Sequence, residues 1–142
     1  MLKNINPILS PELLKILCEM GHGDEIVIAD ANFPSANYGQ RLVRADGISG
    51  TDVLNAVLSV FPLDTYSQSN FILMQLVPDD VGKIDPVIWK EYEVIANKHD
   101  PNLRMGSEER FAFYERAKKA YCVIATGEKA IYANVILKKG VI

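Results

Sequence analysis

The stretch GHGDEIVIADANFP, residues 21–34, places one histidine and several acidic or amide side chains at the two ends of a short apolar run. His22 lies between Gly21 and Gly23, which free the backbone and leave room for a ligand beside the imidazole ring. An imidazole titrates near neutral pH, so His22 suits proton transfer. Asp30 directly follows the apolar run, at the carboxyl end of an expected strand, where α/β folds bind their ligands. His22 and Asp30 are therefore the first candidates for acid–base chemistry.

Two other pairs of side chains could help to bind a ligand. Arg110 and Tyr114 are four residues apart, so on a helix they would place a cation beside a phenol. Taken alone, an arginine behind two glutamates is more typical of a surface ion pair. Tyr132 and Asn134 alternate along an expected strand and would share one of its faces. That face would suit hydrogen bonding to a polyhydroxyl ligand, although an exposed strand face would show the same pattern.

The length of a strand limits which acidic groups can meet. A strand rises ~3.3 Å per residue, which separates Asp24 from Asp30 by roughly 20 Å and excludes a carboxylate dyad. The same spacing argues against His22, Asp24 and Asp30 converging on a metal ion, so no metal site is expected. Asp24 is interpreted as a turn acceptor near the histidine loop. If His22 and Asp30 serve one site, either the chain folds back at Gly23 or the two residues come from different subunits.

Composition and motifs exclude several classes of function. The chain has no phosphate-binding loop, no dinucleotide fingerprint and no nucleophile elbow, so we expect chemistry by side chains alone, without a cofactor. Its net charge is −3 and its basic residues are scattered, which argues against nucleic acid as a partner. Its apolar runs are far shorter than the ~20 residues of a membrane span, and no signal pattern opens the chain, so we expect a cytoplasmic protein without membrane contact. Cys18 and Cys122 lie in apolar segments and are expected to be buried, reduced thiols.

The elements that must position these side chains alternate between strands and helices. Ser10, Pro11 and Glu12 predict a helix start, with serine as the N-cap. Further helices are expected at 51–60, from 85 onward and from 107 to 120, and strands at 25–29, 42–44, 71–77, 121–126 and 132–137. His99 is expected in a solvated loop. The pattern predicts an α/β fold over residues 1–142, a single three-layer domain with a mixed central sheet flanked by helices.

Three ordered motifs carry a resemblance to a known family. The stretch GHGDEIVIADANFP, then RFAFYERAKKA at 110–120, then YANVILKKG at 132–140 together resemble the ribose pyranase and fucose mutarotase family. The resemblance extends over almost the whole chain and includes SPELL at 10–14 and RADG at 44–47. DANFP and RFAFYER are more similar to the fucose mutarotase branch than to the ribose pyranase branch.

The resemblance implies a ribose pyranase-like fold and an isomerase that interconverts the α and β anomers of L-fucose by ring opening and reclosure, without a cofactor. It implies homo-oligomeric rings, commonly decamers of two stacked pentamers, with sites at subunit boundaries. His22 matches the catalytic histidine of the family, and Asp30 matches an aspartate in its sugar pocket. Arg110 matches a sugar-binding arginine, and Tyr132 with Asn134 matches a binding pair. Tyr114 matches a motif tyrosine in or near the site, with a catalytic role.

Three alternatives stay open at this point. The protein could act mainly on ribose or another monosaccharide, because residues 68–102 match the family only loosely and could shape sugar preference. It could also be a sugar-binding module in which histidine and aspartate only hydrogen-bond a ligand. A metal-dependent hydrolase is a third possibility, against which the ligand spacing argues.

Overall fold

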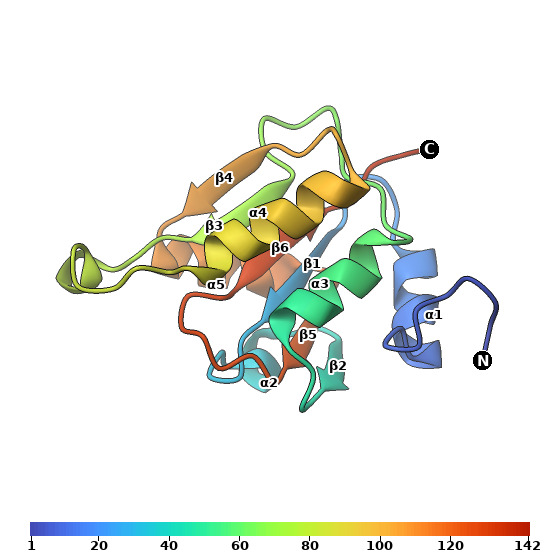
Figure 1. The fold of residues 1–142 in the computed structure, drawn as a ribbon, viewed down its shortest axis with the longest axis horizontal. Coiled ribbons are helices and arrows are strands. Elements are labelled where there is room, and N and C mark those ends of the chain that lie inside the picture. The colour runs from blue at the N-terminus through green and yellow to red at the C-terminus, as the bar shows by residue number, and fades with distance from the viewer.

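In the computed structural model, which describes residues 1–142, six strands form one mixed sheet with helices on both faces (Figure 1). The strands are β1 (Glu25–Ala29), β2 (Leu42–Ala45), β3 (Phe71–Met74), β4 (Met105–Glu108), β5 (Cys122–Thr126) and β6 (Val135–Lys138). Their order across the sheet is β2-β5-β1-β6-β3-β4. β6 is antiparallel to both of its neighbours, β1 and β3, whereas the other pairs are parallel.

The helices divide between the two faces of the sheet. They are α1 (Pro11–Glu19), α2 (Ser35–Tyr38), α3 (Gly50–Leu58), the 3-10 helix η1 (Pro78–Asp80), α4 (Ile88–His99) and α5 (Arg110–Lys119). In β1, Ile26 and Ile28 pack in a cluster with α1, α3 and α4, whereas Val27 and Ala29 pack with Phe113 of α5. Alternating side chains of one strand therefore fill two separate cores, as the three-layer prediction requires. None of the helices has the length and apolar character needed to cross a membrane.

Several local predictions are confirmed. Pro11 begins α1, and the Ser10 hydroxyl accepts a hydrogen bond from the Leu13 amide at 3.2 Å, which satisfies a donor that the helix itself leaves unpaired. The strand expected at 25–29 has the bounds of β1. The Asp24 carboxylate accepts the amide of Gly21 at 2.7 Å and so holds the turn that carries His22.

Other local predictions were wrong. Ser107 and Glu108 belong to β4, an edge strand that the sequence did not indicate, and the α5 helix begins only after Glu109 caps it. Tyr132 and Asn134 precede β6, and Tyr132 has a φ of 61°, so strand alternation does not explain their placement. Helix α4 begins at Ile88.

Two side chains also differ from expectation in their surroundings. Cys122 is buried, as expected, but Cys18 is exposed on α1. His99 is the last residue of α4 and bonds through Nε2 to Asn55 Oδ1 at 2.8 Å, so it joins α4 to α3 and does not lie in a free loop.

Candidate active site

One end of the sheet gathers most of the candidate side chains. Since β6 runs antiparallel to β1 and β3, the start of β6 lies beside the ends of both strands. β4 runs parallel to β3, so the start of α5, which follows β4, lies at the same end. Asp30, Arg110, Tyr132 and Asn134, although far apart in the sequence, therefore reach one region.

Asp30 and Asn134 form a buried reciprocal pair. The Asp30 amide donates to Asn134 Oδ1 at 2.8 Å, and the Asn134 amide nitrogen donates to the Asp30 carboxylate at 2.8 Å. The second carboxylate oxygen accepts the Asn32 amide at 2.9 Å. Asp30 and Asn134 are only 5% and 4% exposed. Burial raises the pKa of Asp30 although these hydrogen bonds oppose the shift, because removal from water disfavours the ionised carboxylate.

The segment before β6 is held by two aromatic donors of α4, of which Tyr92 is fully buried and Trp89 partly buried. Trp89 Nε1 donates to the Tyr132 carbonyl at 2.8 Å, and the Tyr92 hydroxyl donates to the Ala133 carbonyl at 2.9 Å. These bonds from α4 hold Tyr132 in its left-handed backbone conformation, which is uncommon for a residue with a side chain. Backbone outliers of this kind persist where the surrounding structure fixes them, often at functional sites.

The side chain of Tyr132 is fixed by residues of the segment after β3. Its hydroxyl donates to a carboxylate oxygen of Asp80, and the Val77 amide donates to the same hydroxyl at 3.3 Å. Burial, followed by the hydrogen bond to Asp80, raises the pKa of Tyr132, so the phenol stays protonated. Nothing in the sequence pattern singled out Asp80, because it lies 52 residues from its partner.

Arg110 and Tyr114 are neighbours on α5, as their spacing predicted. Arg110 Nε donates to the Tyr114 hydroxyl at 3.2 Å, and no carboxylate pairs with Arg110, contrary to the ion-pair reading. The Tyr114 ring stacks on Tyr38 with 5.1 Å between ring centroids and meets the edge of Phe33 at 5.5 Å. Aromatic packing therefore fixes the phenol that orients the guanidinium group.

Together these groups surround a hollow of about 350 Å³, which we call the Asp30 hollow. Its lining comprises Asp30, Asn32, Phe33, Met74, Val77, Asp80, Arg110, Tyr114, Ile131, Tyr132 and Asn134. Carboxylate, amide, guanidinium and phenol groups line the hollow together with apolar side chains, an arrangement that can hold a ligand with several hydroxyls. Residues 1–142 contain no cluster of three or more His, Cys, Asp or Glu side chains that could hold a metal ion.

His22 lies at the other end of β1, away from this hollow. The Gly23 amide bonds to the Lys139 carbonyl at 2.8 Å, which extends the pairing of β1 with β6, so the chain does not fold back at Gly23. The His22 ring is about half exposed and lies 5.3 Å from the ring of Tyr66, itself 77% exposed. A single chain therefore brings together every candidate residue except His22.

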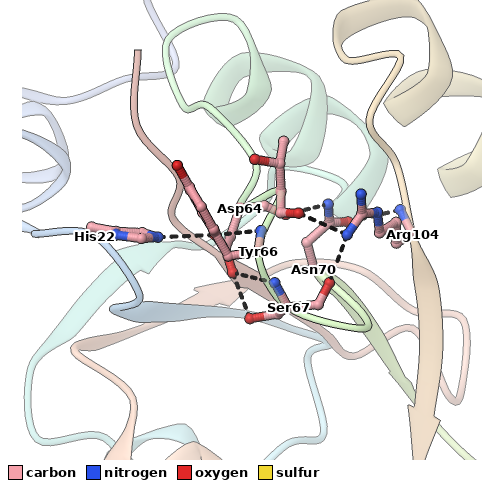
Figure 2. A network of polar contacts seen from close by, with 7 residues as sticks. His22, Asp64, Tyr66, Ser67, Asn70 and Arg104 are labelled. Carbon is pink, nitrogen blue, oxygen red and sulfur yellow. Dashed lines mark hydrogen bonds and ion pairs between the residues drawn. The ribbon is translucent and has the colours of Figure 1, made fainter.

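The partner of His22 is Asp64, a residue that sequence reasoning missed. His22 Nε2 lies 2.9 Å from Asp64 Oδ1, and Figure 2 shows the ring pointing toward the loop that carries Asp64. Asp64 is 1% exposed and also accepts the amides of Tyr66 and Ser67 at 3.1 and 3.0 Å. Burial opposes its charge, but the hydrogen bonds from Ser67, His22 and the backbone outweigh it and hold its pKa well below the usual range. The two residues are 42 positions apart, so no local motif could reveal them.

The loop around Asp64 is braced by Asn70 and Arg104, the residues directly before β3 and β4. The Asn70 amide nitrogen donates to the Asp64 carbonyl at 2.8 Å, and Arg104 Nη1 donates to the carbonyls of Thr65 and Ser67 at 2.7 and 3.0 Å (Figure 2). An ionised carboxylate can only accept, so His22 Nε2 carries the hydrogen of this bond and Nδ1 is left to face a reactant. The His22–Asp64 pair is therefore preorganised for proton exchange.

Comparison with known proteins agrees with this architecture. Residues 3–142 match the model of the RbsD / FucU transport protein family. The chain is 53% identical over 148 residues to the fucose mutarotase of Bos taurus, covering 99% of this chain and 94% of that protein. It superposes with a TM-score of 0.92 and 47% identity on the fucose mutarotase of Streptococcus pneumoniae in complex with L-fucose, over 99% of each chain. RbsD of Bacillus subtilis, complexed with D-ribose, superposes with a TM-score of 0.76 at 25% identity, over 100% of this chain and 99% of that chain. The chain therefore belongs to the RbsD / FucU transport protein family.

Proposed function

We propose that this protein is an isomerase, a mutarotase that interconverts the α and β anomers of L-fucose. The observation that carries the proposal is the Asp30 hollow, with its buried carboxylate–amide pair, in a chain 47% identical over 99% of its length to a fucose mutarotase whose structure contains L-fucose. Asp30, Arg110 and Asn134 would hold the sugar hydroxyls by hydrogen bonds. Tyr114 would act through Arg110, whose guanidinium group it orients.

Mutarotation needs only proton transfers. One proton leaves the anomeric hydroxyl O1, another reaches the ring oxygen O5, the C1–O5 bond breaks, and C1 and O1 form an aldehyde. Rotation of the aldehyde and the reverse transfers close the ring on its other face. A base and an acid suffice, each typically contributing about 10²- to 10⁴-fold in rate, so the reaction needs no cofactor. His22 would exchange one of these protons through Nδ1, and ionised Asp64 would stabilise the positive charge that His22 carries.

We propose further that His22 acts on a sugar bound in the Asp30 hollow of a neighbouring subunit, within a ring-shaped homo-oligomer such as a decamer. Support comes from the separation of His22 and Asp30 along β1 and from exposed apolar side chains near both. Tyr66, beside His22, is 77% exposed, and Ile131, at the hollow, is 48% exposed. Burying such surfaces between subunits would stabilise an assembly and exclude water from the reacting sugar.

The remaining expectations are part of the same proposal. We propose a single domain over residues 1–142 that acts in the cytoplasm on a monosaccharide, with no nucleic acid or membrane as partner. A preference for ribose is the second candidate, favoured by the likeness to RbsD, which is complexed with D-ribose.

The test is the rate of anomer exchange, measured by saturation-transfer NMR on L-fucose, D-ribose and galactose with and without the protein. The wild-type protein should accelerate exchange most for L-fucose, and His22→Ala should abolish this acceleration while the circular dichroism spectrum is retained. Faster exchange of D-ribose than of L-fucose would favour the ribose alternative. Binding of L-fucose without faster exchange would make the protein a sugar-binding module. Full activity of folded His22→Ala would refute the assignment of His22.

A further inference from the structure

The Asp30 hollow contains a second carboxylate, that of Asp80, which the proposed mechanism leaves without a role. Asp80 ends the 3-10 helix η1 in the segment between β3 and α4, which projects beyond the sheet and is yellow-green in Figure 1. Its side chain accepts the hydroxyl hydrogen of Tyr132. A carboxylate beside a binding site is a candidate for a role in the reaction, because its charge changes the energy of proton transfer at that site.

We propose that Asp80 is a positioning residue for Tyr132: it takes up the phenol's hydrogen so that Tyr132 faces the sugar as a hydrogen-bond acceptor and can relay a proton away from it. This inference rests on the proposed mutarotase function and deepens it. A tyrosine hydroxyl has one hydrogen, and here that hydrogen is committed to Asp80. The Val77 amide occupies part of the acceptor capacity of the same oxygen. The capacity that is left is available to a sugar hydroxyl in the hollow.

Backbone bonds fix the carboxylate in this position. The Asp80 amide donates to the Val77 carbonyl at 2.9 Å, and the Asp80 carbonyl accepts the amides of Lys83 and Ile84, each at 3.0 Å. Tyr132 is fixed from the other side by Trp89, which bonds its carbonyl at 2.8 Å. Donor and acceptor are therefore both held before a ligand arrives, which is the condition for efficient proton transfer.

The relay balances in atoms and charge. The proton on O1 of the sugar moves to the Tyr132 oxygen, which breaks the O1–H bond and forms a new O–H bond on the phenol. The proton that Tyr132 carried before moves to the Asp80 carboxylate. At the same time the C1–O5 bond breaks, C1 and O1 form the aldehyde, and O5 takes a proton from the His22 imidazolium. Asp80 ends protonated, His22 ends neutral, and Tyr132 is again a phenol. Ring closure on the other face reverses each transfer.

The test uses a matched set of variants at Asp80, Tyr132 and the neighbouring Asp79. Asp80→Asn keeps the size of the side chain and an oxygen that can accept the phenol, but it cannot hold the relayed proton. Asp79→Asn is the control, because Asp79 lies in the same 3-10 helix, is exposed and does not line the hollow. Values of kcat and KM for L-fucose exchange come from saturation-transfer NMR at several sugar concentrations.

Asp80→Asn should lower kcat about 10²-fold, with KM within about twofold of the wild-type value, because it removes proton transfer and not sugar contacts. Asp80→Glu, which keeps a carboxylate, should recover part of kcat, and Asp79→Asn should behave as wild type. In a Tyr132→Phe background, Asp80→Asn should cause no further loss, because Asp80 acts only through the phenol. If Asp80→Asn does not fold, Asp80→Ser replaces it in the same comparisons.

Two results would overturn the role of Asp80. The first is an unchanged kcat in folded Asp80→Asn, whether or not KM rises. A rise in KM alone would mean that Asp80 only holds the segment between β3 and α4 in place. The second is an equal loss of kcat in the wild-type and Tyr132→Phe backgrounds. The proposed function fails separately, if the wild-type protein does not accelerate the anomer exchange of L-fucose.

Discussion

Two inactive variants should restore each other's activity if each site takes His22 from one chain and Asp30 from another. The perturbation is His22→Ala in one set of subunits and Asp30→Asn in the other, each removing one half of the site. The five residues of β1 alone span about 13 Å at ~3.3 Å per residue, and both candidate side chains lie beyond its ends. Proton transfer requires heavy atoms within about 3 Å or one bridging water. His22 and Asp30 of one chain therefore cannot both contact the same sugar.

The expected magnitude follows from random assembly. In an equal mixture, a boundary is functional only when the chain that supplies histidine carries Asp30→Asn and the chain that supplies aspartate carries His22→Ala. Each condition is met half of the time, so about a quarter of the wild-type activity per site should return. The control mixes wild-type chains equally with the double variant: about a quarter is again expected for a shared site, but about half for a site within one chain.

The assay is saturation-transfer NMR of L-fucose exchange on subunits that are co-expressed or refolded together. Each single variant alone gives the baseline. The shared site would be refuted if the exchange rate of the mixed single variants stayed at this baseline while the control mixture kept about half of the wild-type activity per site. They would leave His22 with a role in its own subunit only.

Two further predictions follow from the same geometry. Asp64→Asn should slow exchange about 10²-fold, as assayed by NMR, because His22 loses its charged partner. It should also lower the free energy of unfolding in urea by about 1–3 kcal/mol at pH 7. This loss should shrink progressively as the pH falls below ~4, because the stabilisation by ionised Asp64 is complete above the unfolded-state pKa and disappears as the pH falls through the lower folded-state pKa. Equal effects at pH 7 and pH 3 would contradict this. In a pH profile of kcat, the acid limb set by Asp30 should move to higher pH in Asn134→Ala, because that amide opposes the burial that raises the pKa of Asp30. An unmoved limb would count against ionised Asp30 as the working form.

The local parts of the fold were predictable because their causes lie close together in the sequence. The Ser10 cap, the strand at 25–29 and the Arg110–Tyr114 contact each depend on residues within a few positions of one another. The edge strand β4 was missed because its sequence, MGSE, has little β propensity and forms a strand only by pairing with β3.

The sequence alone determined the α/β class. It identified His22 and Asp30, at the two ends of the stretch 21–34, as candidates, and it showed that they cannot meet along one strand. It also identified Arg110, Tyr132 and Asn134 as candidates, although strand alternation was the wrong reason for the last two.

Only the tertiary structure decided which groups are partners. His22 meets Asp64 across 42 residues, and Tyr132 meets Asp80 across 52. The loops that share one end of the sheet come together only once the strands have paired. The pKa shifts of Asp30 and Asp64 have the same origin. Burial and hydrogen bonding are properties of the folded environment, and two aspartates of one sequence acquire opposite shifts within it.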